Sequence, residues 1–354
     1  MKLKSRSKLR YENSWLRHRS SSSVDADFGK KFFEGVMKGL RLSLVFAVAG
    51  WSVAPGLAWG QTGGGFNLAT ATKGRCANRV AIALTGKGPT AEVTSAPDPQ
   101  ATADTLLASA DFIEHFSRFY NARANIGPGA NAAEDATYYL TKHILTNKLK
   151  WKDLFIGAFD LVTAGMGAAQ TVTVQANPNG LGYFRNRAWM DRYAGNEQAG
   201  IKLNTAFRMM NNVLGLELVA TTNAPGADVS ATGRQAGSCK SCHYEGWYAL
   251  DVNAAVLSRV VRNGNTVTYT PPDGQPKQVL GGTMARDDKE FVTAMVNSEA
   301  FSFNACRLAF SFVYGRNENQ CEAELFDKCI DEFKKTEQIQ SAITAIVKDP
   351  SFCN

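Results

Sequence analysis

The sequence predicts a mainly α-helical protein. Apolar side chains recur at helical spacing in several segments, as with Phe112, Phe116 and Phe119 at i, i+4 and i+7. Glycine and proline stand between these segments, where they are typical of turns. Alternating apolar and polar runs, which would indicate strands, are few. At 354 residues the chain is long enough for two domains with separate cores.

The first 60 residues predict a leader with a signal peptide. The apolar run over 41–58 follows basic residues and ends at Ala58-Trp59-Gly60, a small-x-small cleavage site. Pro55 interrupts this run and makes it short for a membrane span; a retained membrane anchor is the alternative. Residues 1–36 are polar and serine-rich, so a start at Met37 would give a signal peptide of ordinary length.

The net charge of the chain indicates which classes of binding partner to expect. The leader holds 11 of the 39 Lys and Arg and 4 of the 32 Asp and Glu, which leaves residues 61–354 with 28 of each sign. This neutral remainder lacks the basic excess of nucleic-acid-binding proteins, and the sequence contains no P-loop. We therefore expect neither nucleic acid nor nucleotide as a partner. Export would take the chain to the periplasm, or to the outer membrane or cell surface.

A linker and a helical domain are expected after the leader. Residues 61–74 are Gly- and Thr-rich and predict the linker. The helical domain, 75–225, is bounded by a polar loop that leads to the next domain. Proline and glycine segments between its apolar stripes separate its elements. We expect helices over 76–84, 111–121, 133–148 and 200–219, and an apolar, aromatic stretch over 151–161.

Residues Cys239-Lys240-Ser241-Cys242-His243 form C-x-x-C-H, the c-type haem attachment motif. Two thiols three positions apart can add to the two vinyl groups of one porphyrin, and the histidine can give the iron a proximal imidazole. With 7 Cys and 4 His in the chain, roughly 0.002 chance occurrences are expected. The motif predicts one covalent haem c, with Cys239 and Cys242 as attachment sites and His243 as iron ligand.

Two other readings of the motif have less support. A structural zinc site needs four ligands, and the sequence has no second C-x-x-C or H-x-x-x-H pair. A thioredoxin-like redox pair should follow a buried strand in a βαβ unit, whereas residues 231–238 are small and polar and indicate a loop.

The haem domain is expected over 226–354, as a cytochrome c-like helical domain with a Cys-rich end. A helix over 247–261 would be able to wall the porphyrin, and 267–274 suggests a small hairpin or loop. Apolar periodicity and the stops at Gly315 and Pro350 define the remaining elements. These are helices over 287–298, 304–314, 322–334 and 337–348.

The second axial ligand decides what the iron can do, because a methionine favours electron transfer and an empty position allows ligand chemistry. Met284 is the leading candidate, since it lies in a loop-like glycine segment 41 residues after His243. His143 and His115 are alternatives, and so is an open or water-bound iron. The weaker candidates are Met209, Met210, Met295, Met190 and Met166.

Five cysteines lie outside the motif, so at least one is expected to stay free or to pair with another chain. In an oxidising compartment, Cys321–Cys329 and Cys306–Cys353 would staple the terminal helices and leave Cys76 over. Four cysteines permit three pairings, and the sequence does not choose among them.

The C-terminal third resembles the haem-binding tail of large exported cytochromes from planctomycetes and myxobacteria, whose roles are mostly uncharacterised. This resemblance implies a small cytochrome c domain behind a helical domain, while Cys321, Cys329 and Cys353 depart from the general pattern. The segments that carry it are Cys239-x-x-Cys242-His243, Asp273-Gly274, Leu280-Gly281-Gly282, Cys306-Arg-Leu-Ala and Tyr314-Gly315-Arg316, and upstream Leu84-Thr85-Gly86, Asn125-Ile-Gly-Pro-Gly129 and Trp151-Lys-Asp-Leu-Phe155.

These observations together predict an exported monohaem c-type cytochrome that transfers single electrons rather than a catalyst. A redox partner protein or a larger membrane-associated complex is the expected partner. Two alternatives stay open: a haem-containing oxidoreductase subunit with an open iron site, and a structural haem module of a surface assembly. A di-haem peroxidase would need two C-x-x-C-H motifs, and the sequence has one.

Overall fold

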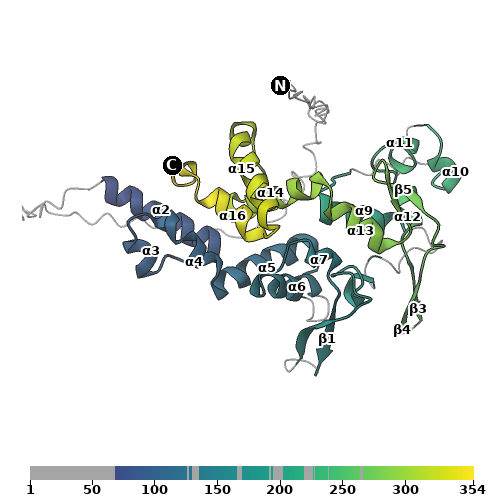
Figure 1. Ribbon diagram of the computed structural model, residues 1–354, viewed down its shortest axis with the longest axis horizontal. Coiled ribbons are helices and arrows are strands. Elements are labelled where there is room, and N and C mark those ends of the chain that lie inside the picture. Colours follow the sequence, from purple (N-terminus) through teal and green to yellow (C-terminus); the bar gives the residue numbers. More distant parts are fainter. Residues whose placement is uncertain are drawn as a thin grey trace, which may run out of the picture. The chain divides into compact units, whose positions relative to one another are not determined.

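The computed structural model describes residues 68–125, 127–129, 135–165, 170–190, 193, 202–218, 226, 228–237, 239–263 and 266–354. The described residues belong to one compact unit, residues 65–354. The predicted leader, with its signal peptide and cleavage site, lies outside the described residues. The unit is mainly helical, which confirms the predicted fold class (Figure 1). No helix among the described residues combines the length and the apolar character of a membrane span.

The first described helix, α2 (Leu68–Thr85), begins earlier than the helix expected at 76. Its first turns occupy the end of the predicted linker, because the segment from Leu68 continues the helix without a glycine or proline until Gly74. Short helical turns follow α2, and two of them begin with a side-chain cap: the Thr90 hydroxyl accepts from the backbone N–H of Val93, and the Asp98 carboxylate accepts from that of Gln100. These turns are α3 (Ala91–Ser95), η2 (Pro99–Thr102) and α4 (Ala103–Leu107).

Helix α5 (Ala110–Ala124) carries the aromatic face that its periodicity predicts. Phe112 and Phe116 are fully buried. The ring of Phe116 packs at 4.9 Å, centroid to centroid, against Phe312, which comes from the far C-terminal part of the chain. Helix α6 (Ala136–Thr146) lies beside α5. Aromatic packing therefore joins the predicted helical domain to the C-terminal helices.

A β-hairpin follows where the sequence analysis expected only an apolar stretch. After the short helix α7 (Asp153–Ile156), strand β1 (Phe159–Ala164) pairs antiparallel with β2 (Thr171–Ala176). The Thr-Val-Thr-Val alternation in β2 is a strand signal that the sequence analysis did not use. The two strands form a sheet of their own.

The loop after this hairpin approaches α7 so closely that it requires glycine. Gly182 has φ +48°, and a Cβ added there would lie 2.0 Å from the carbonyl oxygen of Leu154. The backbone N–H of Gly182 also donates to the carbonyl of Gly157, at 2.8 Å. A side chain at this position would therefore strain the backbone conformation and collide with rigid backbone.

We expect Gly182→Ala to lower the free energy of unfolding by about 2–4 kcal/mol, from left-handed backbone strain plus the backbone shift that relieves the collision. Gly315→Ala is the matched control, because Gly315 has φ +68° and nothing described lies within 4 Å of its added Cβ. Denaturant unfolding should show about 1–2 kcal/mol for the control. Equal losses in the two variants would contradict the close approach.

Helix α9 (Leu203–Leu214) packs against helices from the later part of the chain. It follows the short turn α8 (Arg187–Trp189), and its buried face carries Met210 and Val213. The side-chain amide of Asn304 donates to the carbonyl of Val213 at 3.0 Å, which satisfies one of the last carbonyls of α9. Helix α9 contacts three helices that all follow the C-x-x-C-H motif in the sequence.

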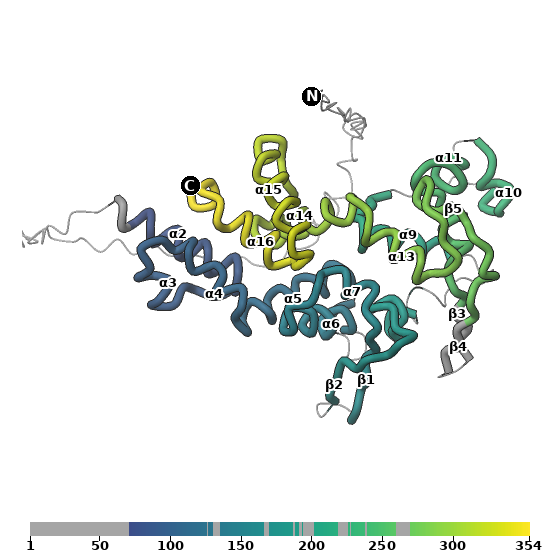
Figure 2. The backbone as a smooth tube through the Cα atoms, viewed as in Figure 1, coloured from purple at the N-terminus to yellow at the C-terminus, as the bar shows by residue number. Residues whose placement is uncertain are grey.

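The C-terminal helices confirm the helices expected over 287–348. Helix α14 begins five residues before the expected 304. The elements are α13 (Asp288–Val296), α14 (Glu299–Tyr314), η5 (Gln320–Glu322), α15 (Ala323–Thr336), α16 (Ile339–Val347) and η6 (Pro350–Cys353). Helices α14, α15 and α16 contact one another, and they appear together in Figure 2.

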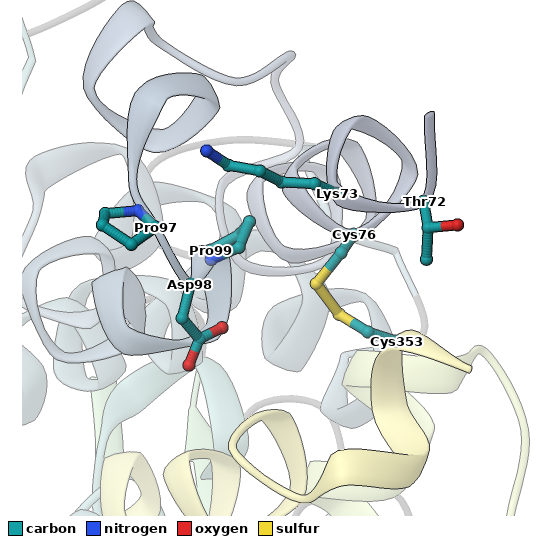
Figure 3. A pocket seen from close by; sticks show the side chains of 7 residues that line it. All are labelled: Thr72, Lys73, Cys76, Pro97, Asp98, Pro99 and Cys353. Atoms are coloured by element: carbon teal, nitrogen blue, oxygen red, sulfur yellow. A yellow bond between two sulfur atoms is a disulfide. The ribbon is translucent and has the colours of Figure 1, made fainter. Parts of the chain in front are cut away.

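Two disulfides form, and their pairing corrects the expected one. Cys76 bonds to Cys353, with 5.0 Å between their Cα atoms, and Cys306 bonds to Cys329. Cys321 is the free and exposed cysteine. The expected Cys321–Cys329 and Cys306–Cys353 bonds are wrong, because η6 returns the chain end to α2 while α15 turns Cys329 toward α14. Figure 3 shows the first disulfide beside an open pocket.

Residues on both sides of the domain boundary expected near 225 lie in the same compact unit. The Cys76–Cys353 disulfide joins the start of the predicted helical domain to the end of the predicted haem domain, across 277 positions of sequence. Buried residues from both segments also form one continuous hydrophobic core. A polar loop in the sequence therefore does not mark a break in the packing here.

Candidate functional site

The C-x-x-C-H motif forms a single helical turn, α11 (Cys239–His243). The sequence analysis expected a loop over 231–238, but residues Ala231–Arg234 form a further turn, α10, whose N-terminus is capped by the Ser230 hydroxyl. After the helix ends at His243, the chain turns at Gly246, which adopts φ +66°. Contacts join α10 to α11 and α11 to the next helix, α12 (Leu250–Ala255).

Cys239 and Cys242 are free thiols, and both are partly exposed. They stand three positions apart on one helical turn, so their side chains share a face. Burial raises the pKa of Tyr248, which follows the motif in the sequence. The two thiols are therefore partly accessible to a group that would react with both.

The imidazole of His243 is held by a carboxylate. Its Nδ1 lies 2.7 Å from Oδ2 of Asp251, on α12, and a carboxylate can only accept, so Nδ1–H is the donor. No described residue hydrogen-bonds to the other ring nitrogen, Nε2. This is the arrangement in which a histidine offers Nε2 to a metal.

Asp251 is itself held from a second side. The guanidinium of Arg234, on α10, donates Nη2–H to Oδ1 of Asp251 at 2.7 Å and Nε–H to Oδ2 at 3.1 Å. The hydroxyl of Tyr244 lies 3.2 Å from the same Oδ1. We call Arg234, His243, Tyr244 and Asp251 the Asp251 network. The network connects α10, α11 and α12, three short helices that contain few buried apolar residues.

The Asp251 network is mostly shielded from water. The side chains of Arg234, Asp251 and His243 are 9%, 12% and 16% exposed. Burial acts to raise the pKa of Asp251, but the hydrogen bonds from Arg234 and His243 outweigh it and hold that pKa below its ordinary value. The carboxylate is therefore ionised at neutral pH and accepts strong, charge-assisted hydrogen bonds.

Asp251 and Arg234 were not among the residues predicted from the sequence. Asp251 follows His243 by eight positions, and Arg234 precedes the motif, so neither belongs to the motif pattern. Only their chemistry could have pointed to them, because an Arg and an Asp near a histidine that would bind a metal are candidates to orient its imidazole.

Met284 lies on a strand rather than in the expected loop. Strand β5 (Lys277–Val279) pairs antiparallel with β6 (Thr283–Ala285), and Met284 stands opposite Gln278. The turn between them contains Gly281, at φ +72°, whose added Cβ would lie 3.6 Å from the ring of Trp247. The glycine turn thus contacts the segment just after the haem motif, as a close backbone approach requires. Met284 itself is 56% exposed.

The alternative histidines pack elsewhere. The ring of His115 lies 5.1 Å from that of Phe312, and the ring of His143 lies 5.0 Å from that of Phe159. Burial lowers the pKa of both histidines. Among the described residues, the ring contacts of both histidines are thus with phenylalanines outside α11.

The remaining methionines are mostly buried. Met209, Met210 and Met295 belong to the core, and Met190 packs against it. Met210 is distinctive, because its sulfur accepts a hydrogen bond from the side-chain amide of Asn253, on α12, at 3.4 Å. Met166 lies outside the described residues.

Other metal or ligand sites have little support among the described residues. These residues contain no cluster of three or more His, Cys, Asp or Glu arranged to hold a metal ion, whereas structural zinc takes four such ligands. The pocket in Figure 3 is lined by residues around the Cys76–Cys353 disulfide, none of which belongs to the motif or to the Asp251 network.

Comparisons with protein-family profiles, with curated proteins and with solved structures find no match to this chain.

Proposed function

We propose that the protein is an exported monohaem c-type cytochrome that carries single electrons. The observation that carries this proposal is the state of His243: Asp251 holds its Nδ1, and Nε2 has no hydrogen-bond partner in the described part of the chain. Histidines that bind a metal through one ring nitrogen usually donate the other N–H to such a partner. The free thiols of Cys239 and Cys242 supply the groups that thioether formation needs.

These residues fit a covalently attached haem. Cys239 and Cys242 would hold the porphyrin, and Nε2 of His243 would bind its iron. The haem, when bound, would supply an iron that alternates between the ferrous and ferric states. Asp251 and Arg234 keep the imidazole in one orientation, so the protein need not reorganise when the iron changes its charge.

The proposed location is the periplasm, or the outer membrane or cell surface. The predicted leader supports export, and the two disulfides are of the kind that persists in an oxidising compartment. The electron partner would be a redox protein or a larger membrane-associated complex. The helical region before the motif, with its long α5 and α6, would supply the docking surface.

We expect the purified protein, produced in a host that matures c-type cytochromes, to keep its haem through acid-acetone extraction. Its mass should exceed that of the polypeptide by one haem. The Cys239→Ala, Cys242→Ala double variant should lose the covalent haem, because no thiol remains to form a thioether. Cys321→Ala is the matched control, since Cys321 is also a free thiol but lies outside the motif. Extractable haem in the unmodified protein would refute the proposal.

A further inference from the structure

We propose that Asp251 is a positioning residue that makes His243 a stronger electron donor and thereby lowers the reduction potential of the haem iron. This inference rests on the proposed function, since it concerns the histidine that would bind the iron. It goes beyond that function because it assigns a task to a side chain outside the attachment motif. It also predicts the direction in which the protein tunes its iron.

The geometry makes Asp251 a fixed acceptor. Its carboxylate is 12% exposed and meets Nδ1 of His243 at 2.7 Å. Arg234 grips both carboxylate oxygens from the opposite side, and its own Nη1–H donates to the backbone carbonyl of Val229. The carboxylate cannot rotate away from the imidazole without breaking this bidentate pair.

The chemical consequence follows from the charge of the acceptor. An ionised carboxylate that accepts the Nδ1–H bond raises the basicity of the imidazole more than a neutral carbonyl would. A more basic ligand stabilises the ferric state relative to the ferrous state, and hydrogen bonding around the axial ligand is one of the means by which proteins set haem potentials. Arg234 moderates the effect, because it shares the carboxylate's negative charge.

Two measurements on the haem-loaded protein test this inference. The first is the reduction potential, from an equilibrium redox titration. The second is the iron–imidazole stretching frequency, from resonance Raman spectra recorded after carbon monoxide is photolysed from the reduced protein, with every variant compared in a Met284→Ala background that frees the predicted sixth coordination position. In Asp251→Asn we expect the potential to shift upward and the stretching frequency to fall, because a neutral amide leaves the imidazole less basic.

Loss of the negative charge of Asp251 could by itself raise the reduction potential of the iron, so a charge-compensated variant is needed. The double variant Asp251→Asn, Arg234→Gln restores the net charge of the network but not the carboxylate. We expect it to keep the lowered stretching frequency. Asp273→Asn is the surface control, since Asp273 carries the same charge and pairs with Lys277 at an exposed site; both readings should stay at the wild-type values.

Asp251→Glu provides a conservative variant in case the asparagine variant folds poorly. It keeps the carboxylate, so it should retain more of the wild-type stretching frequency than Asp251→Asn does. An unchanged frequency in Asp251→Asn with haem attached would overturn the inference and leave the proposed function standing. Covalent haem missing from the unmodified protein would instead refute the proposed function, so the two failures are distinguishable.

Discussion

Replacing both Cys76 and Cys353 by alanine will lower the free energy of unfolding by about 4 kcal/mol. The disulfide closes a loop of 277 positions, and a cross-link restricts the unfolded chain more as the loop it closes grows. It also holds η6, the last element of the chain, against α2, the first described helix. Urea unfolding followed by far-UV circular dichroism measures the loss.

Cys321→Ala is the control for this prediction. Cys321 is exposed and unpaired, so its replacement should change the free energy of unfolding by less than about 0.5 kcal/mol. A loss below about 1 kcal/mol in the Cys76→Ala, Cys353→Ala variant would contradict the prediction, and so would thiol titration that finds both cysteines reduced in the exported protein.

Most helices were predictable because their apolar faces are regular. In α5 the phenylalanines at 112 and 116 repeat with the helix and are both fully buried. The same holds for α9 and for the C-terminal helices, and glycine ends α9 and α14 while Pro350 follows α16. Local periodicity suffices in such cases, because one helical stripe faces one core.

The helix expected over 247–261 was predicted too long. Helix α12 ends at Ala255, and strand β3 (Arg259–Asn263) begins soon after it. Strand β3 pairs antiparallel with β4 (Thr266–Thr270), so the hairpin lies earlier in the chain than the hairpin or loop expected over 267–274. The valines of β3 are β-branched and suit a strand, but a short apolar run cannot be assigned to helix or strand by its periodicity alone.

The disulfide pairing and the Asp251 network were not predictable, for a shared physical reason. Both depend on which helices meet in three dimensions, whereas sequence spacing reports only local neighbours. Cys353 meets Cys76 because α16 and η6 return to α2. Arg234 meets Asp251 because α10 and α12 both pack against α11. The C-x-x-C-H pattern itself was visible in the sequence because its three residues lie within one helical turn.

In the proposed cytochrome, the residue that would supply the second iron ligand decides most about function. Met284 is still our predicted ligand there. Its hairpin turn contacts Trp247, just after the motif, and its side chain is free of the core. Met210 is the competing thioether, because its sulfur contacts α12 through Asn253. Substitution of each methionine separates these possibilities.

Met284→Ala will lower the reduction potential and abolish the sulfur-to-iron charge-transfer band of the oxidised protein, because a thioether that stabilises the ferrous state is lost. Covalent haem will persist, since attachment rests on Cys239 and Cys242. Met295→Ala is the control: this fully buried methionine should leave the band intact but lower stability by about 2–5 kcal/mol. Loss of the band in Met210→Ala instead would identify Met210 as the ligand. A band and potential unchanged in both variants would leave His143, His115 or an open iron.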